Sequence, residues 1–305
     1  MSILKQYYND DRSILNIDDS FNKSLKGINF PKSLYHIIFG SSFNQSLEYV
    51  GLPYNLQTIT FGYSFNRSLH KVNFPRNLQT LIFGSSFDQP LVRVILPRNL
   101  QTIIFGHGFD QPLYEVIFPY NLRTIIFGHN FNQPLDQVSL PSSLQTITFG
   151  RNFDQSLNNV NLPSGIQSIV LGDLFNELLD KVKLPHSLTT ITFGHDYNQP
   201  LDAVSFPLSL KVIIFGNIFN QSLDKVSLPF GIQSITFGCN YKKPLNNLPN
   251  SVEKLVFRKI NMDITNLPCS VTHIKILEHI AKSMEKLIKI PYGCKIIDKY
   301  DNEIQ

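Results

Sequence analysis

The fold is decided by one stretch of sequence, Phe131-Asn132-Gln133-Pro134-Leu135-Asp136-Gln137-Val138-Ser139-Leu140-Pro141-Ser142-Ser143-Leu144-Gln145-Thr146-Ile147-Thr148-Phe149-Gly150. Two segments within it, 135–140 and 144–149, have apolar residues in the spacing L-x-x-L-x-L. A proline ends the first segment and a glycine ends the second. This alternation of apolar and polar residues is typical of half-buried strands. Neither segment is long enough to be stable by itself, so the stretch must pack against other parts of the chain.

The same stretch recurs along the chain at a constant step of 22 residues. The aromatic residue that begins it is found at Phe21, Phe43, Phe65, Phe87, Phe109, Phe131, Phe153, Phe175, Tyr197, Phe219 and Tyr241. A proline and a glycine keep the same step, from Pro31 to Pro229 and from Gly40 to Gly238. Repeats of this length cannot bury their apolar face alone, and they become stable by stacking on one another.

We therefore predict a mainly β, leucine-rich-repeat-like fold: a right-handed solenoid or horseshoe of about twelve 22-residue coils with stacked parallel strands. Each coil is expected to hold two strands, one ended by proline and one by glycine. The repeated glycines are expected at turns with positive φ. The Asn or Asp that follows each repeated aromatic residue is expected to hydrogen-bond turn backbone.

Three regions are predicted along the chain. Residues 1–20 form an N-terminal lead-in or cap, 21–245 the regular solenoid, and 246–305 degenerate repeats with a C-terminal cap, where the spacing of the prolines becomes irregular. Residues 278–289 fit a short amphipathic helix within this cap. Its apolar side would hold Ile280, Met284, Leu287 and Ile288.

Composition limits the classes of function. The net charge is +4, and Lys and Arg are scattered, so no nucleic-acid partner is expected. Three cysteines cannot all pair within the chain, which favours reduced thiols in an intracellular protein. The N-terminal residues lack the apolar stretch of a secretory signal, and no apolar run is long enough for a membrane span, so no membrane association is expected.

The repeated unit, Phe-Asn-Gln-[Ser/Pro]-Leu-x-x-Val-x-[Leu/Phe]-Pro-x-x-Leu-x-x-Ile-x-Phe-Gly, resembles the FNIP repeat. This leucine-rich-like unit is best known from social amoebae and from the giant viruses that infect amoebae. The resemblance covers about residues 15–245 without a gap and continues weakly to residue 300. It implies a cytoplasmic protein, in the host cytoplasm if the chain is viral. Several members carry an F-box before the repeats, which implies substrate adaptors of ubiquitin ligases. Here about 20 residues precede the repeats, too few for an F-box.

Candidates for chemistry are few. His107, His129 and His195 share one repeat position, and the first two fall in adjacent coils about 5 Å apart, where two imidazoles could bind a metal. The next coil supplies Arg151 instead of a further ligand, so exposed turn residues are the favoured interpretation. Asp88, Asp110 and Asp154 occupy the Asn position and are interpreted as turn caps. We expect no catalytic residue, no cofactor and no metal, and the chain is not expected to be an enzyme.

The outward positions of the glycine-ended strand are the most informative part of the surface. They are filled by Thr, Ser, Ile and Val with almost no charge. We predict a protein-binding surface made of Thr80, Ile82, Thr102, Ile104, Thr124 and Ile126, with Ile95 and Ile117 from the proline-ended segment. A plain strand preference for Thr and Ile explains the same residues equally well.

The leading hypothesis is a protein-interaction scaffold whose partner is unknown. The alternative is the substrate-recognition subunit of a ubiquitin ligase that lacks its own F-box. A remote alternative is an ice-binding solenoid, because three coils carry Thr-x-Thr: Thr58 and Thr60, Thr146 and Thr148, Thr190 and Thr192.

Overall fold

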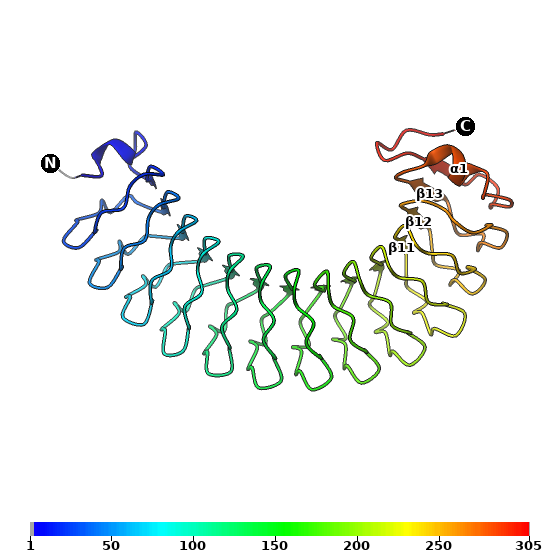
Figure 1. The fold of residues 1–305 in the computed structure, drawn as a ribbon, viewed down its shortest axis with the longest axis horizontal. Coiled ribbons are helices and arrows are strands. Elements are labelled where there is room, and N and C mark those ends of the chain that lie inside the picture. Colours follow the sequence, from blue (N-terminus) through cyan, green and yellow to red (C-terminus); the bar gives the residue numbers. More distant parts are fainter. Residues whose placement is uncertain (1–2, 305) are drawn as a thin grey trace. The chain divides into compact units, whose positions relative to one another are not determined.

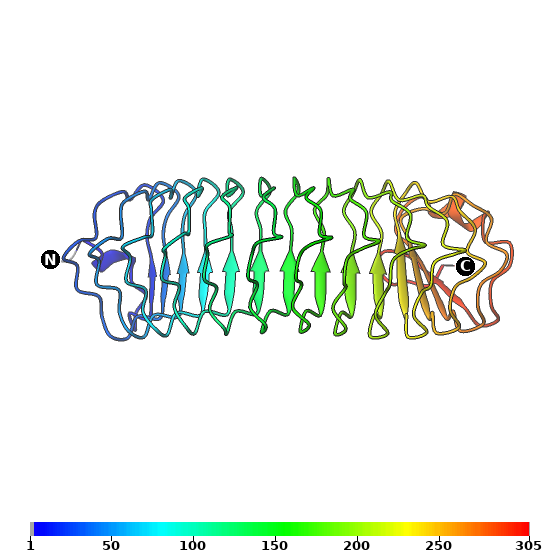
Figure 2. The same cartoon turned by 90° about the horizontal axis from the view of Figure 1, so that it is seen from below.

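The computed structural model describes residues 3–304, which divide into two compact units, 3–153 and 154–304. Each unit is a stack of coils, and each coil contributes one short strand (Figures 1 and 2). Within each unit the strands lie side by side on the inner side of the curved stack (Figure 1). The fold is thus a mainly β solenoid built from parallel strands, as the repeat predicts.

In the first unit the strands follow chain order. A 3-10 helix, η1 (Lys5–Tyr7), precedes them. They are β1 (Ile14–Asn16), β2 (His36–Ile38), β3 (Thr58–Thr60), β4 (Thr80–Ile82), β5 (Thr102–Ile104), β6 (Thr124–Ile126) and β7 (Thr146–Thr148). Neighbouring strands within this unit pair in parallel at a register shift of 22 residues, as in Ile82↔Ile104 and Ile104↔Ile126.

The second unit continues the same pattern with a change near its end. Its strands are β8 (Ser168–Val170), β9 (Thr190–Thr192), β10 (Val212–Ile214), β11 (Ser234–Phe237), β12 (Lys254–Phe257), β13 (His273–Ile276) and β14 (Lys295–Ile297). Ser234 pairs with Lys254 and Lys254 with His273, so the coils shorten where the repeat becomes irregular. Parallel pairing therefore survives beyond residue 245, although the sequence motif has decayed.

The expectation of two strands per coil is wrong. In the regular coils of residues 3–304 the strand lies in the glycine-ended segment, and the proline-ended segment is a turn followed by chain without strand pairing. In residues 135–140 the N–H of Val138 donates to the carbonyl oxygen of Leu135 (3.1 Å), and that of Leu140 to Val138 (3.2 Å). These donors are used within the coil, so they are not free to pair with the next coil.

The expected reason for the repeated glycines is also wrong. Among residues 3–304, the glycines with positive φ are Gly27 and Gly293, and neither belongs to the repeated series. Instead, successive coils approach closely at this point. A Cβ on Gly128 would overlap the carbonyl oxygen of Gly106, and the same holds along the series. Glycine is required here because the backbone of the previous coil fills the space of a side chain.

The core consists of two ladders of aromatic rings. The ring of Phe109 stacks on that of Phe131 with centroids 6.1 Å apart, and Phe105 stacks on Phe127 at 5.5 Å. Phe105 and Phe109 also stack on each other at 4.1 Å, so the ladders are in contact. The repeated Leu, Val and Ile positions are buried beside the rings, as predicted.

The repeated Asn or Asp hydrogen-bonds the backbone of the following coil, which confirms its predicted role. Its side-chain oxygen accepts from the N–H of the equivalent residue one coil later, as Asp110 does from Asn132 (2.9 Å) and Asn198 from Asn220 (2.9 Å). In several coils the adjacent Gln donates to the same oxygen, as Gln133 does to Asp110 (3.0 Å).

The helix predicted over 278–289 is shorter than expected. It is α1 (Ile280–Met284), and Ser283 is the residue that it buries. The hydroxyl of Ser283 accepts from the N–H of Ile260 (3.1 Å). Leu287 lies beyond the helix, half-buried, and Ile288 is exposed. Ile280 and Met284 are half-buried as well, and the segment is also held by backbone contacts, such as the N–H of Ile264 donating to the carbonyl oxygen of Lys286 (2.7 Å).

Candidate interaction surfaces

The predicted strand surface lies on β4, β5 and β6. The middle residue of each strand is buried and its two neighbours are half-exposed, so Thr and Ile face away from the core as expected. The parallel register aligns them in two rows, and neighbouring residues within a row are about 4.8 Å apart. One row is Thr80, Thr102 and Thr124, and the other is Ile82, Ile104 and Ile126. We call these six residues the strand face. The isoleucine row is a contiguous apolar stripe, bordered on β3 by Thr60 and on β7 by Thr148.

Ile95 and Ile117 lie elsewhere. They are on the proline-ended segments of their coils and are far more exposed than the strand face, with 81% and 85% of their surface accessible. Both line surface hollows, of about 310 Å³ around Ile95 and about 190 Å³ between Ile95 and Ile117. None of the residues that line these hollows belongs to β4, β5 or β6. The structure therefore separates these two isoleucines from the six residues with which the sequence grouped them.

The histidine pair stacks face to face. The rings of His107 and His129 have centroids 3.9 Å apart and are inclined by 6°. The lone pair of an imidazole nitrogen lies in the plane of its ring. Because the two rings are parallel and stacked, their nitrogens do not converge on one ion. Within residues 3–304 there is no group of three His, Cys, Asp or Glu side chains arranged to hold a metal. His195 lies in the second unit, where its Nδ1 is 2.6 Å from Oδ1 of Asp196.

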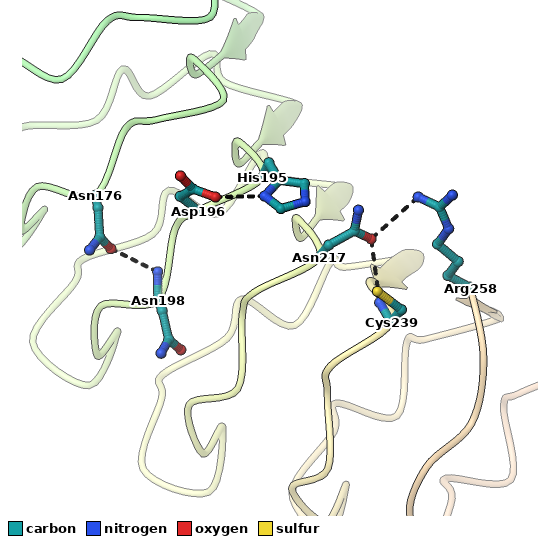
Figure 3. A network of polar contacts seen from close by, with 7 residues as sticks. All are labelled: Asn176, His195, Asp196, Asn198, Asn217, Cys239 and Arg258. Carbon is teal, nitrogen blue, oxygen red and sulfur yellow. Dashed lines mark hydrogen bonds and ion pairs between the residues drawn. The ribbon is translucent and has the colours of Figure 1, made fainter.

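A polar network runs along several coils of the second unit (Figure 3). The side-chain oxygen of Asn217 accepts from the N–H of Cys239 (3.4 Å), and Nη1 of Arg258 lies 3.5 Å from it. Cys239 and His195 are two coils apart, about 10 Å, which is beyond the reach of a thiol–imidazole pair. This network joins successive coils and does not assemble a nucleophile with a base.

Arg258 of this network also forms an ion pair with Glu278. Nη2 of Arg258 lies 2.9 Å from Oε1 of Glu278. The hydrogen bond between them raises the pKa of Arg258 and lowers the pKa of Glu278. Both side chains are about half-exposed, so the pair ties the last coils together only weakly.

Sequence reasoning missed the arginines beside Ile95. Arg76 and Arg98 line the larger hollow with it, although they are 22 residues apart in sequence. The signal was present in the repeat itself. Each arginine directly follows the repeated proline, so the two positions coincide once the coils are aligned.

No helix within residues 3–304 has the length and apolar character to cross a bilayer.

Comparison with known proteins identifies the repeat. The FNIP Repeat family matches residues 21–64, 65–108, 109–152, 153–196, 175–218, 197–240 and 219–259. The sequence matches no curated protein.

Among solved structures, the chain is similar to CroV588, described as a novel circular leucine-rich-repeat protein, from a giant virus. The two share 31% identity with a TM-score of 0.79 over 94% of this chain, which spans 46% of the length of CroV588. Weaker similarities are to a leucine-rich repeat protein from Bacteroides ovatus (13% identity, 88% and 82% of the two chains, TM-score 0.27). YopM from Yersinia enterocolitica matches at 13% identity over 90% and 80% of the chains, with a TM-score of 0.31.

Proposed function

Because the chain belongs to the FNIP repeat family, we propose that it is a non-enzymatic scaffold that binds another protein. The observation that carries the proposal is the strand face, with its three isoleucines in successive coils. Repeat folds of this kind present extended curved surfaces for binding. We place the partner on the strand face and on the strands beside it.

The strand face suits a protein partner because it carries no charge that must be desolvated. Burying its isoleucine stripe would yield roughly 25 cal/mol per Å² of apolar area. A standard interface covers about 800 Å² on each partner, more than six half-exposed side chains supply. The contact would therefore extend to neighbouring coils, where Thr60 and Thr148 continue the uncharged rows.

The chemistry of the molecule supports a binding role over catalysis. The repeated Asn and Asp residues, which we call the Asn ladder, and the repeated glycines are occupied in coil-to-coil contacts. The histidine pair and the Cys239 network lack the convergent geometry of a metal or nucleophile site. Specificity must therefore come from residues that differ between coils. The strand face consists of such residues.

The test compares three charge-introducing variants in partner capture. The full chain serves as bait in the cells from which it derives, with cross-linking and mass spectrometry, and the captured protein is then purified for direct affinity measurement. Ile104→Asp and Ile126→Asp should weaken its binding about tenfold or more, since each buries a charge against an apolar contact. Ile214→Asp is the matched control, because Ile214 holds the same half-exposed position on β10 between Thr192 and Thr236.

Two results would contradict this assignment. Equal affinity of all three variants would remove the strand face as the contact. Capture of ubiquitin-ligase core subunits, retained by Ile104→Asp, would indicate the adaptor role instead.

A further inference from the structure

Two exposed isoleucines depart from the pattern of their repeat position. Ile95 and Ile117 each follow the buried valine of their coil, and their accessible fractions are 81% and 85%. The same position holds Asn29, Gly51, Asn73, Ser139, Asn161, Lys183, Ser205 and Ser227 in the other coils. The fold thus forms with a small or polar residue at this repeat position. Two adjacent isoleucines, exposed to this degree, call for an explanation outside the fold.

The hollow around Ile95 places two arginines beside it. Arg76 and Arg98 line it together with Val72, Leu96 and Pro97, in a volume of about 310 Å³. Both arginines directly follow the repeated proline of neighbouring coils, so their side chains leave the backbone about 5 Å apart. Within residues 3–304 neither of them forms an ion pair. Two unpaired guanidinium groups therefore flank an exposed apolar side chain.

A second hollow extends the first. It has a volume of about 190 Å³, shares Ile95 and Leu96 with the larger hollow, and reaches Ile117 between Arg93 and Glu115. We call the two hollows together the arginine groove. Its charged lining residues are three arginines and one glutamate, so the groove has an excess of positive charge over an apolar floor.

We propose that the arginine groove binds an extended acidic peptide segment of a partner protein. An aliphatic side chain of the peptide packs on Ile95 and Ile117, and a neighbouring carboxylate binds Arg76 and Arg98. Guanidinium groups pair with carboxylates through two parallel hydrogen bonds, which gives both affinity and orientation. The groove spans three coils, about 10 Å, which corresponds to about three residues of extended chain.

Peptide fits this groove better than nucleic acid does. Single-stranded nucleic acids are held by aromatic side chains on which bases stack. The groove holds one aromatic side chain, the half-buried Phe74, and its exposed apolar residues are the aliphatic Ile95 and Ile117. The positive charge is also confined to a short segment, whereas backbone binding needs a basic track along many phosphates.

This inference rests on the protein-binding role proposed above, but it uses a surface separate from the strand face. The chain supplies its own replacements for the test. Ile95→Asn introduces the residue found at Asn73, and the double variant Arg76→Ser/Arg98→Ser introduces the residue found at Ser142 and Ser164. Lys183→Ser and His186→Ser change the same two repeat positions in the second unit, outside the groove, and are the matched controls.

The experiment is selection of a phage library of random dodecapeptides on the immobilised full-length chain. We expect enriched peptides to contain acidic residues next to Ile, Leu or Val. Their recovery should fall roughly tenfold or more on Ile95→Asn and on Arg76→Ser/Arg98→Ser, and stay unchanged on the two controls. A synthetic peptide of the enriched sequence should bind more weakly as salt is raised.

The proposal is overturned if no peptide is enriched, if the enriched peptides lack carboxylates, or if the groove variants recover them as well as the wild type does. Tighter binding of a fluorescent oligothymidylate than of the selected peptide, lost in Arg76→Ser/Arg98→Ser, also overturns it. Peptides that are lost on Ile104→Asp but kept by the groove variants would uphold the strand face and reject the groove. Failure of the two proposals is therefore distinguishable.

Discussion

The space that a Cβ of Gly128 would occupy is filled by the carbonyl group of Gly106, one coil earlier. Backbone, and not a movable side chain, is the obstacle. The coils therefore cannot accept a larger residue at this point without separating, and the strands paired beside it would separate with them. This relationship makes the glycine series a sensitive measure of how tightly the coils stack.

Gly128→Ala should lower the free energy of unfolding by about 3 kcal/mol, because the new methyl group overlaps backbone atoms that cannot move aside without separating the coils. Urea denaturation followed by circular dichroism measures the change. Gly51→Ala is the control, since a Cβ there meets nothing within 4 Å. It should be neutral or slightly stabilising. Equal effects of the two substitutions would show that close coil contact is not the reason for the repeated glycine.

Asn198→Ala should destabilise the protein by about 1 kcal/mol. The side-chain oxygen of Asn198 accepts from the N–H of Asn220 and from Nε2 of Gln221, and both donors lose this partner. Asn198→Asp keeps the acceptor and should stay close to the wild type, because Asp88 and Asp110 perform the same role in the first unit. Thermal denaturation of the two variants measures this difference in stability. An Asp variant as unstable as the Ala variant would contradict the role of the acceptor oxygen.

Tyr197→Phe should raise the free energy of unfolding by about 1–3 kcal/mol. Tyr197 stands in the aromatic ladder between Phe175 and Phe219, and its buried hydroxyl makes no hydrogen bond. Phenylalanine fills this position in most coils, so the ring packing is kept while the unpaired hydroxyl is removed. Tyr120→Phe, at an exposed site, should change nothing. Scanning calorimetry compares them, and a destabilised Tyr197→Phe would reveal a hydrogen bond to the hydroxyl in solution.

The protein should lose stability above about pH 10, in part through two tyrosines. Burial raises the pKa of Tyr197 and of Tyr241 above the ordinary value of 10.0. In this range the unfolded chain ionises its tyrosines while the folded chain keeps these two neutral. Their contribution is therefore complete below about pH 10 and is lost as the pH rises further. Urea midpoints from about pH 9 to about pH 11 measure the decline. The double variant Tyr197→Phe/Tyr241→Phe should decline less steeply, and an identical slope would exclude these residues as the cause.

No thermal hysteresis is expected from this protein in freezing solution. Ice-binding surfaces of the Thr-x-Thr type need an uninterrupted regular array, and here β4, β5 and β6 place isoleucine where the row of Thr60 and Thr148 would continue. Ice-crystal growth under a nanolitre osmometer is the direct measurement. Faceted crystals at low protein concentration would revive the ice-binding alternative.

The repeat made most of the fold predictable from sequence. A constant step of 22 residues places Phe109 beside Phe131 and Ile104 beside Ile126 before any coordinates are considered. The segment 135–140 was misjudged for a physical reason. Its apolar spacing is that of a strand, but spacing does not reveal that the N–H groups of Val138 and Leu140 are used inside the coil.

The candidate sites were only partly predictable. The orientation of Ile82 and Ile104 followed from strand alternation and is confirmed. The glycine series has two explanations in sequence, positive φ or close approach, and only the stacking of the coils distinguishes them. Arg76 and Arg98 looked scattered, because charges that are 22 residues apart become neighbours only when the coils are superimposed.

The Asn ladder has a consequence for how such a gene changes. Each hydrogen bond, or rung, of the ladder joins a residue to its counterpart one coil away. The donor is always the backbone N–H and the acceptor the side-chain oxygen, as between Asn132 and Asp110. Duplication or loss of one 22-residue segment in the regular region therefore leaves every rung with a matching neighbour. A change of one whole coil in chain length therefore preserves the hydrogen bonds, whereas a single-residue insertion within a coil would shift its residues out of register with the next coil.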